Sequence, residues 1–291
     1  MAELLRNLSQ RERLNFLLTN RIPRRMATRF MGWFSGIESP RLTRLSLSVW
    51  QKFADDLRLD EASKREFSSL RDCFTRELRP GARPIASGSD IVTSPCDAIV
   101  GACGSIQGIT ALQAKGFPYE LSDLIPDAPI RDKYRDGIYV TLRLKSSMYH
   151  RFHAPVECDV KRVTYVSGDT WNVNPIALRR IERLYCKNER AVIDLDTGGP
   201  GSGICLVAVA AILVASIKLH CLPGSVDIRH AGPEQLACSA SYAKGDEMGY
   251  FQHGSTIILF ATHDHALCEG VQEGRRIDMG LPLLHRLALP S

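Results

Sequence analysis

A hydroxyl, two imidazoles and a carboxylate stand in three polar clusters of this chain, and each is a side chain that does chemistry in enzymes. The hydroxyl belongs to Ser255, in Gly254-Ser255-Thr256 directly before the apolar run Ile257 to Phe260. A Gly-Ser bond there is either an ordinary turn before a strand or a bond that the chain cleaves itself, turning the serine into a pyruvoyl group. Because glycine and serine are common in turns, the tripeptide alone does not decide between these interpretations.

The imidazoles belong to His150 and His153, in the segment Met148 to Pro155. Two histidines three residues apart can be acid–base groups, metal ligands or residues of a surface loop. No further His or Cys cluster completes a metal site in the sequence. Acid–base chemistry is therefore the better functional interpretation, and no metal is expected.

The carboxylate belongs to Asp97, in the turn Thr93 to Ala98 between two apolar runs. Such an Asp often only bonds its own backbone. Asp97, His153 and Ser255 together are nevertheless the components of a catalytic triad, so a membrane-surface serine esterase stays open as a function. An α/β-type serine hydrolase would show G-x-S-x-G between a strand and a helix, whereas Ser255 precedes a strand and lacks the second glycine.

The elements that must position these side chains are mostly strands. From about residue 85 the chain consists of short β-rich runs bounded by Gly, Pro, Asp and Ser, with a helix expected at 175–184. Most connections are too short for βαβ crossovers, so we expect an α+β fold with N-terminal amphipathic helices on a mainly antiparallel β core, sandwich-like or barrel-like. The expected strands are 91–92, 99–100, 138–144, 160–166, 191–193, 204–217, 239–243 and 256–261.

The N-terminal region is basic and apolar at helical spacing. Residues 1–50 carry nine Arg and three Glu, which gives them a net charge of +6. The whole chain has a net charge of +5, so the excess of positive charge lies in this region. Helices are expected over 9–23, over 26–34 and from the cap Ser39-Pro40 onward. Arginine mixed with large apolar side chains is typical of an interfacial membrane anchor, although a helical cap packed on the core is the alternative, and a nucleic-acid arm is disfavoured. We therefore expect residues 1–80 to be a membrane-associating region and residues 81–291 a β-rich catalytic domain.

Composition sets further limits. With 291 residues, 44% hydrophobic and 24% charged, the chain can bury a full core. Its nine cysteines are odd in number and include no C-x-x-C pair, so neither a disulfide framework nor a zinc site is expected and the compartment is reducing. No signal peptide is recognisable at the N-terminus. The longest apolar run, Ile204 to Ala215, is too short for a transmembrane helix.

Several short motifs together resemble the bacterial phosphatidylserine decarboxylase proenzymes, a family of pyruvoyl-dependent enzymes. The resemblance covers nearly the whole chain, because the motifs occur in family order and at the family's distances from the C-terminus. They are the basic N-terminal helices, Leu112-Gln113-Ala114-Lys115-Gly116, Tyr149-His150-Arg151-Phe152-His153-Ala154-Pro155, Asn188-Glu189-Arg190, Lys244-Gly245-Asp246-Glu247-Met248-Gly249 and Gly254-Ser255-Thr256.

The resemblance implies a two-stage chemistry. Autocatalytic serinolysis between Gly254 and Ser255 would give a β chain of residues 1–254 and an α chain of residues 255–291 that begins with a covalent pyruvoyl group derived from Ser255. The family assigns the base of this step to the position of His153, oriented by the acid at Asp97. A Schiff base between the pyruvoyl group and phosphatidylserine would then release CO₂ and phosphatidylethanolamine, with His150 serving the decarboxylation step.

The same resemblance implies a role in phospholipid biosynthesis. It places the protein on the cytoplasmic face of the cell membrane as a peripheral protein, a heterodimer of its own α and β chains with further oligomerisation left open, and with no nucleic-acid partner. The chain departs from the family pattern at His253, at Cys96 and Ala98 around the acid, at 170–172 and at 207–214. A relative that only binds anionic lipid is the non-catalytic alternative.

Overall fold

The computed structural model describes residues 24–52, 54, 56–112, 117–199, 202–211, 216–223, 226–227, 233–252 and 255–288. The helix expected over 9–23 therefore lies outside the described residues. The helices are α3 (Arg24–Ser35), α4 (Pro40–Gln51), α5 (Leu70–Phe74), α6 (Leu121–Leu124), α7 (Ala128–Lys133), α8 (Pro175–Leu178) and α9 (Leu184–Lys187), with a 3-10 turn at Leu59–Glu61.

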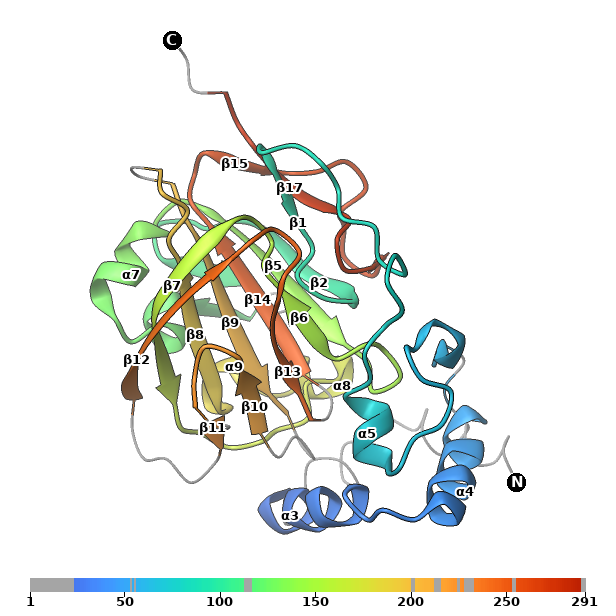
Figure 1. The fold of residues 1–291 in the computed structure, drawn as a ribbon. Coiled ribbons are helices and arrows are strands. Elements are labelled where there is room, and N and C mark those ends of the chain that lie inside the picture. The colour runs from blue at the N-terminus through green and yellow to red at the C-terminus, as the bar shows by residue number, and fades with distance from the viewer. Residues whose placement is uncertain are drawn as a thin grey trace.

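An eight-stranded antiparallel sheet forms the centre of the molecule (Figure 1). Its strands, in spatial order, are β12 (Pro233–Tyr242), β7 (Cys158–Val166), β8 (Arg190–Leu195), β9 (Ile204–Ala210), β14 (Ser255–Ala261), β5 (Ile138–Leu144), β2 (Ala98–Ser105) and β16 (Arg276–Ile277). The described strands leave β12 and β16 as edges, so they do not close into a barrel. The predicted α+β class with an antiparallel core is confirmed.

Three smaller antiparallel sheets accompany the large one. One has the order β11 (Val226–Asp227), β10 (Ser216–Leu219), β13 (Glu247–Phe251) and β6 (Arg151–His153). Another has the order β1 (Ile91–Thr93), β17 (Pro282–Arg286) and β15 (His265–Leu267), and the last pairs β3 (Thr110–Leu112) with β4 (Pro118–Glu120).

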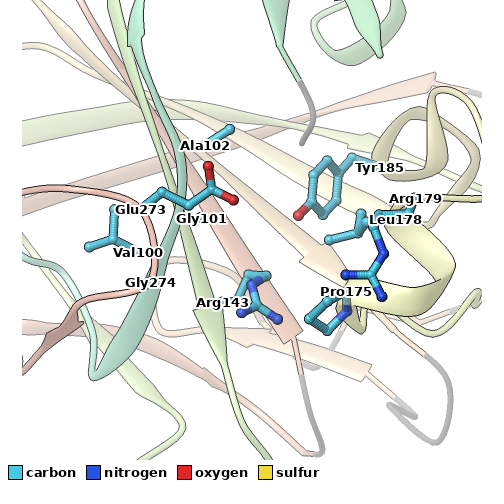
Figure 2. A pocket seen from close by; sticks show the side chains of 10 residues that line it. All are labelled: Val100, Gly101, Ala102, Arg143, Pro175, Leu178, Arg179, Tyr185, Glu273 and Gly274. Atoms are coloured by element: carbon cyan, nitrogen blue, oxygen red, sulfur yellow. The ribbon is translucent and has the colours of Figure 1, made fainter. Parts of the chain in front are cut away.

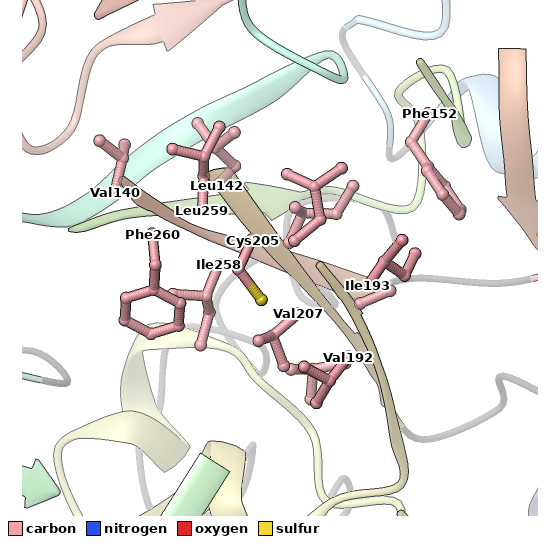
Figure 3. Packing of buried hydrophobic residues seen from close by; sticks show 14 of the residues in the cluster. Val140, Leu142, Phe152, Val192, Ile193, Cys205, Val207, Ile258, Leu259 and Phe260 are labelled. Carbon is pink, nitrogen blue, oxygen red and sulfur yellow. The ribbon is translucent and has the colours of Figure 1, made fainter. Parts of the chain in front are cut away.

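The central strands are covered on both faces because nearly every residue in them is apolar. All seven residues of β9 and all seven of β14 are buried. Alternate side chains of β14 enter different halves of the core: Leu259 lies with Val140 and Leu142, whereas Ile258 and Phe260 lie on the other face (Figure 3). The edge strand β12 instead exposes alternate residues, as expected of a strand with one solvated face.

Two expected elements differ from those observed. In place of the helix expected at 175–184 the structure has α8, which ends at Leu178, and α9, which begins at Leu184. A single helix cannot run through to Leu184, because Arg183 takes a left-handed conformation at φ 51°. The long strand expected at 204–217 is β9, which ends at Ala210, and β10, which begins at Ser216 and pairs in a different sheet.

The N-terminal helices lie at one end of the molecule (Figure 1). The Ser39 side chain caps α4 by accepting from the Leu42 amide, with Pro40 in the first turn, as the sequence predicts. Large apolar side chains on α3 and α4 face outward, among them Trp33 at 64% exposure and Leu45 at 63%. Within the part of the chain that the structure describes, no helix is long and apolar enough to cross a membrane.

Candidate active site

Asp97 is held by an arginine that comes from the start of the β core. Asp97 follows β1, at the tip of the turn into β2, and is 1% exposed. Arg83 donates to both carboxylate oxygens, at 2.8 Å from Nε and 2.6 Å from Nη2, and also reaches Glu61 at 2.8 Å. The backbone amide of Met279 donates to Asp97 at 2.9 Å. Charged and neutral donors together thus fix the carboxylate in position.

The Arg83 side chain is itself only 5% exposed. Burial disfavours its charged form, but the hydrogen bonds to Asp97 and Glu61 outweigh burial and raise the pKa of Arg83. We expect Arg83→Gln to lower the free energy of unfolding by about 3 kcal/mol, because it leaves the Asp97 carboxylate buried without its counter-ion.

Urea unfolding in a Ser255→Ala background, where every molecule is one uncleaved chain, measures this loss. Arg83→Gln combined with Asp97→Asn should lose less than Arg83→Gln alone, since no buried charge is then left unpaired. An equal or larger loss in the double variant would show that the pair does not govern the stability of this turn.

His153, the last residue of β6, is held at both ring nitrogens. Its Nδ1 lies 2.8 Å from the carbonyl oxygen of Gly245, and its Nε2 lies 2.9 Å from the hydroxyl of Tyr149. Since the Gly245 carbonyl can only accept, Nδ1 carries the proton of the neutral ring and Nε2 accepts from Tyr149. The ring therefore presents a basic nitrogen, already engaged by a hydroxyl donor.

Burial is the largest cause that lowers the pKa of His153 below its usual 6.5. The hydrogen bond to Gly245 and the charges of Glu247 and Asp97 act in the opposite direction, while Arg151 adds to the lowering. His153 is consequently a neutral base at neutral pH, and Asp97 favours the imidazolium that forms when the base takes a proton.

His150 is fully buried, in the loop between β5 and β6. Its Nδ1 lies 2.8 Å from the Met148 carbonyl oxygen, so the neutral ring carries its proton on Nδ1 and a lone pair on Nε2. The ring centroid is 4.1 Å from that of Phe74, which in turn stacks on Trp50. An aromatic contact from α5 thus ties this histidine to the N-terminal helices.

Ser255 is the first residue of β14, between Leu144 of β5 and Ala210 of β9. The residue is fully buried, and its Oγ has no hydrogen-bond partner among the described residues. Buried hydroxyls are normally hydrogen-bonded, so burying the Ser255 hydroxyl without a partner lowers the stability of the fold. Gly254 and His253 lie outside the described residues.

The structure brings these predicted residues to one end of the central sheet. The Phe251 amide donates to the His150 carbonyl at 3.0 Å, and four residues later the chain reaches Ser255, a span of at most about 14 Å. The His153 amide donates to the Pro95 carbonyl, two residues before Asp97. No hydrogen bond joins Asp97, His153 and Ser255 to one another among the described residues, so the Asp97 carboxylate influences the His153 ring through space.

Sequence reasoning missed two members of this site. Arg83 lies at the start of the predicted catalytic domain, and nothing in its local sequence indicates a partner 14 positions away. Tyr149 adjoins the predicted His150, but its contact with His153 at spacing i, i+4 depends on the loop conformation. Among the described residues no group of three His, Cys, Asp or Glu is arranged to hold a metal ion.

Comparison with known proteins identifies the family. Residues 70–285 match the family model described as phosphatidylserine decarboxylase. The phosphatidylserine decarboxylase proenzyme of Brevibacillus brevis is 33% identical over 276 residues, which cover 93% of this chain and 97% of that protein. Proteins of the same name from Vibrio campbellii (33% identity, 91% of this chain and 96% of that one) and Erwinia tasmaniensis (32%, 96% and 97%) are similarly related. The chain therefore belongs to the phosphatidylserine decarboxylase family, as the motifs in its sequence predict.

Proposed function

We propose that this protein converts phosphatidylserine to phosphatidylethanolamine and CO₂, in phospholipid biosynthesis, with a pyruvoyl group that it makes from Ser255 by cleaving its own Gly254–Ser255 bond. The observation that carries the proposal is the buried Ser255 Oγ at the start of β14, without a hydrogen-bond partner among the described residues. The relatives of similar length are named proenzymes, which also supports processing into two chains.

Cleavage would begin at the Ser255 hydroxyl. His153 takes the Oγ proton, Oγ attacks the Gly254 carbonyl carbon, and the amide C–N bond breaks as the ester C–O bond forms, leaving a free amine on residue 255. Removal of the Cα proton then breaks the Cβ–Oγ bond and releases Gly254 as a carboxylate. Water finally replaces the nitrogen of the resulting dehydroalanine, which leaves as ammonia, and residue 255 becomes a ketone.

The surroundings of residue 255 fit that product. Its cross-strand neighbours Leu144 and Ala210 are apolar and buried, so a methyl ketone suits this position better than a hydroxyl without a partner. When formed, the pyruvoyl group supplies a carbonyl that condenses with the substrate amine and accepts the electron pair of the breaking bond to CO₂. His150, whose Nε2 lone pair can take up a proton and then pass it on, is the residue that we assign to proton delivery in this stage.

The two products of cleavage would stay together without a covalent link. The whole length of β14 pairs with β5 on one side and with β9 on the other, from Ser255 to Ala261. Removing a strand from the middle of a sheet would expose its ladder hydrogen bonds and its buried side chains. The mature enzyme is therefore a heterodimer of its own α and β chains.

A lipid substrate requires a site at the membrane surface. The exposed apolar side chains on α3 and α4, including Phe30, Trp33 and Leu45, share those helices with the exposed residues Arg29 and Arg41. Apolar side chains entering the headgroup region and arginines meeting anionic lipid are the two components of interfacial binding. We assign residues 1–80 to peripheral attachment on the cytoplasmic face of the cell membrane, with residues 81–291 as the catalytic domain.

Replacing Phe30 and Trp33 together by serine should weaken binding to vesicles containing anionic phospholipid at least about tenfold, because two large side chains no longer enter the bilayer. Sedimentation with sucrose-loaded vesicles measures the partition. Leu281→Ser serves as the control, because Leu281 is an apolar residue of the catalytic domain whose exposed fraction is 42%. This variant should bind as the unsubstituted protein does. If both variants lost the same amount of vesicle binding, α3 would not be part of the membrane-binding surface.

The rate of self-cleavage should be independent of pH between about pH 6.5 and 8 and should fall only at lower pH. The reason is the sign of the shift at His153: burial lowers its pKa below 6.5, so the neutral base persists at pH values where an exposed histidine is already protonated. Timed electrophoresis of newly synthesised protein across pH gives the profile. A rate that already declines on acidification from pH 8 would point to a different base.

A further inference from the structure

A second feature of the central sheet is a cavity of about 90 Å³ that is lined in part by Arg143, Arg179, Tyr185, Leu178, Gly101 and Glu273. Figure 2 shows the side chains of Arg143, Arg179, Tyr185 and Glu273 around one space, contributed by β5, the α8–α9 segment and the loop before β16. None of these residues belongs to the cluster around Asp97 and His153.

The cavity begins one residue from the proposed cleavage site. Arg143 is the cross-strand partner of Thr256, and these two side chains lie on the same face of the sheet. The hydroxyl of Tyr185 interacts with that of Thr256. Ser255 points to the opposite face, but its Cα lies in the plane of the sheet, and this is the carbon that would become the reactive ketone. A substrate held in the cavity is therefore adjacent to the reacting atom.

Hydroxyl groups around the cavity have hydrogen-bonding capacity that the described residues do not use. Tyr185, Thr256 and Thr141 are fully buried, and beyond the contact between the first two, their hydroxyls have no hydrogen-bond partner among the described residues. Thr141 lies directly beneath Gly101, where an added Cβ would stand 3.3 Å from it. Burial raises the pKa of Tyr185, which keeps its hydroxyl protonated and able to donate. Buried hydroxyls with unused hydrogen-bonding capacity indicate a ligand that supplies acceptors.

The charge around the cavity favours an anion. The guanidinium of Arg143 makes no hydrogen bond or ion pair within the described residues, while Arg179 adds a second positive charge to the lining. Glu273 is the acidic side chain in the lining, and it is exposed. A tetrahedral oxyanion can accept from the Arg143 fork and the Tyr185 hydroxyl together.

We propose that this cavity binds the phosphodiester of the phospholipid headgroup, with Arg143 as its principal ligand and Tyr185 as a second donor; the inference rests on the proposed function. The substrate carries a carboxylate as well, but that group must lose its charge as CO₂. An arginine bound to it would stabilise the ground state more than the transition state. The phosphodiester keeps its charge throughout the reaction, so binding it positions substrate and product alike.

Binding can be tested on the Ser255→Ala protein, which does not depend on cleavage or on activity. Glycerophosphoethanolamine, which has the phosphodiester but no carboxylate, is titrated and followed by ³¹P NMR. Arg143→Gln in this background should weaken its affinity about tenfold and Tyr185→Phe several-fold, because each removes a donor to the anion, and Arg143→Lys should retain part of the affinity. Arg135→Gln, at an exposed arginine, should bind as the parent does.

Three results would overturn the assignment. They are no binding of glycerophosphoethanolamine to the parent, an unchanged affinity in both Arg143→Gln and Tyr185→Phe, or binding of free L-serine that depends on Arg143 while glycerophosphoethanolamine does not depend on it. The last would make the cavity a carboxylate site. If Arg143→Gln does not fold, the affinity of Tyr185→Phe for glycerophosphoethanolamine still tests the proposal. A wild-type chain that stays uncleaved would contradict the proposed function instead, and would leave these affinities unaffected.

Discussion

Replacing Ser255 by alanine is expected to leave the protein as a single chain of 32.3 kDa, whereas the wild-type protein should separate into residues 1–254 and 255–291. The side chain that attacks the Gly254 carbonyl is then absent, and no pyruvoyl group can form. Release of CO₂ from phosphatidylserine should fall by at least about a thousandfold, because the loss removes the electrophile as well as the cleavage. Denaturing mass spectrometry and a ¹⁴CO₂ assay make the two measurements.

The matched control is Ser122→Ala, which removes a partly exposed hydroxyl that donates to Glu120. It should cleave and decarboxylate as the wild-type protein does. The mass of the smaller wild-type fragment is decisive, because a pyruvoyl terminus and a serine terminus differ in mass. An active wild-type preparation that consists of one intact chain would contradict the self-cleavage mechanism.

The two histidines should separate the two stages of the chemistry. His153→Ala should slow cleavage by about 10²–10⁴-fold, the range of a lost general base, because it removes the imidazole that Tyr149 and Gly245 hold. His150→Ala should still cleave, and its CO₂ release per pyruvoyl group should fall by a factor in the same range. Titration with an aminooxy reagent counts the carbonyl groups and so normalises activity to cleaved protein.

His263→Ala is a suitable control, since His263 is exposed in the turn between β14 and β15. It should cleave and turn over normally. If His150→Ala blocks cleavage while His153→Ala cleaves but does not decarboxylate, the two roles must be exchanged.

The same proteins address the esterase alternative. A serine esterase that uses Asp97, His153 and Ser255 would remain one chain and react with a fluorophosphonate probe at Ser255. In the structure the Ser255 Oγ is fully buried and makes no hydrogen bond to His153, an arrangement that suits attack on the adjacent peptide bond better than attack on an external ester. We therefore expect no labelling of either chain.

Local sequence determined much of this protein. The apolar runs of β9 and β14 predict buried central strands because each residue's own hydrophobicity selects its environment. Ser39 with Pro40 predicts a helix start because capping acts within one turn. The motifs around His150, His153 and Ser255 indicate the family because they lie within short segments whose order and spacing can be read directly.

Tertiary structure alone decided how those residues are held. Arg83 reaches Asp97 and Glu61, Arg143 faces Thr256 across two strands, and Phe74 packs on His150. Each contact joins segments that are far apart along the chain. The chain has other arginines and phenylalanines in similar local sequences, so the local sequence does not indicate which of them makes the contact. The left-handed conformation of Arg183 directly before α9 is likewise not favoured by its own sequence.

The Ser255 hydroxyl combines both kinds of information. Its sequence context predicts a turn residue before a strand, or a cleavage point. Its complete burial between β5 and β9 and its lack of a partner among the described residues appear only when the sheet is assembled. A sequence specifies which chemical groups are present and which local conformations they favour. The burial of a group and the partners within its hydrogen-bonding distance depend on which distant strands become neighbours in the folded sheet.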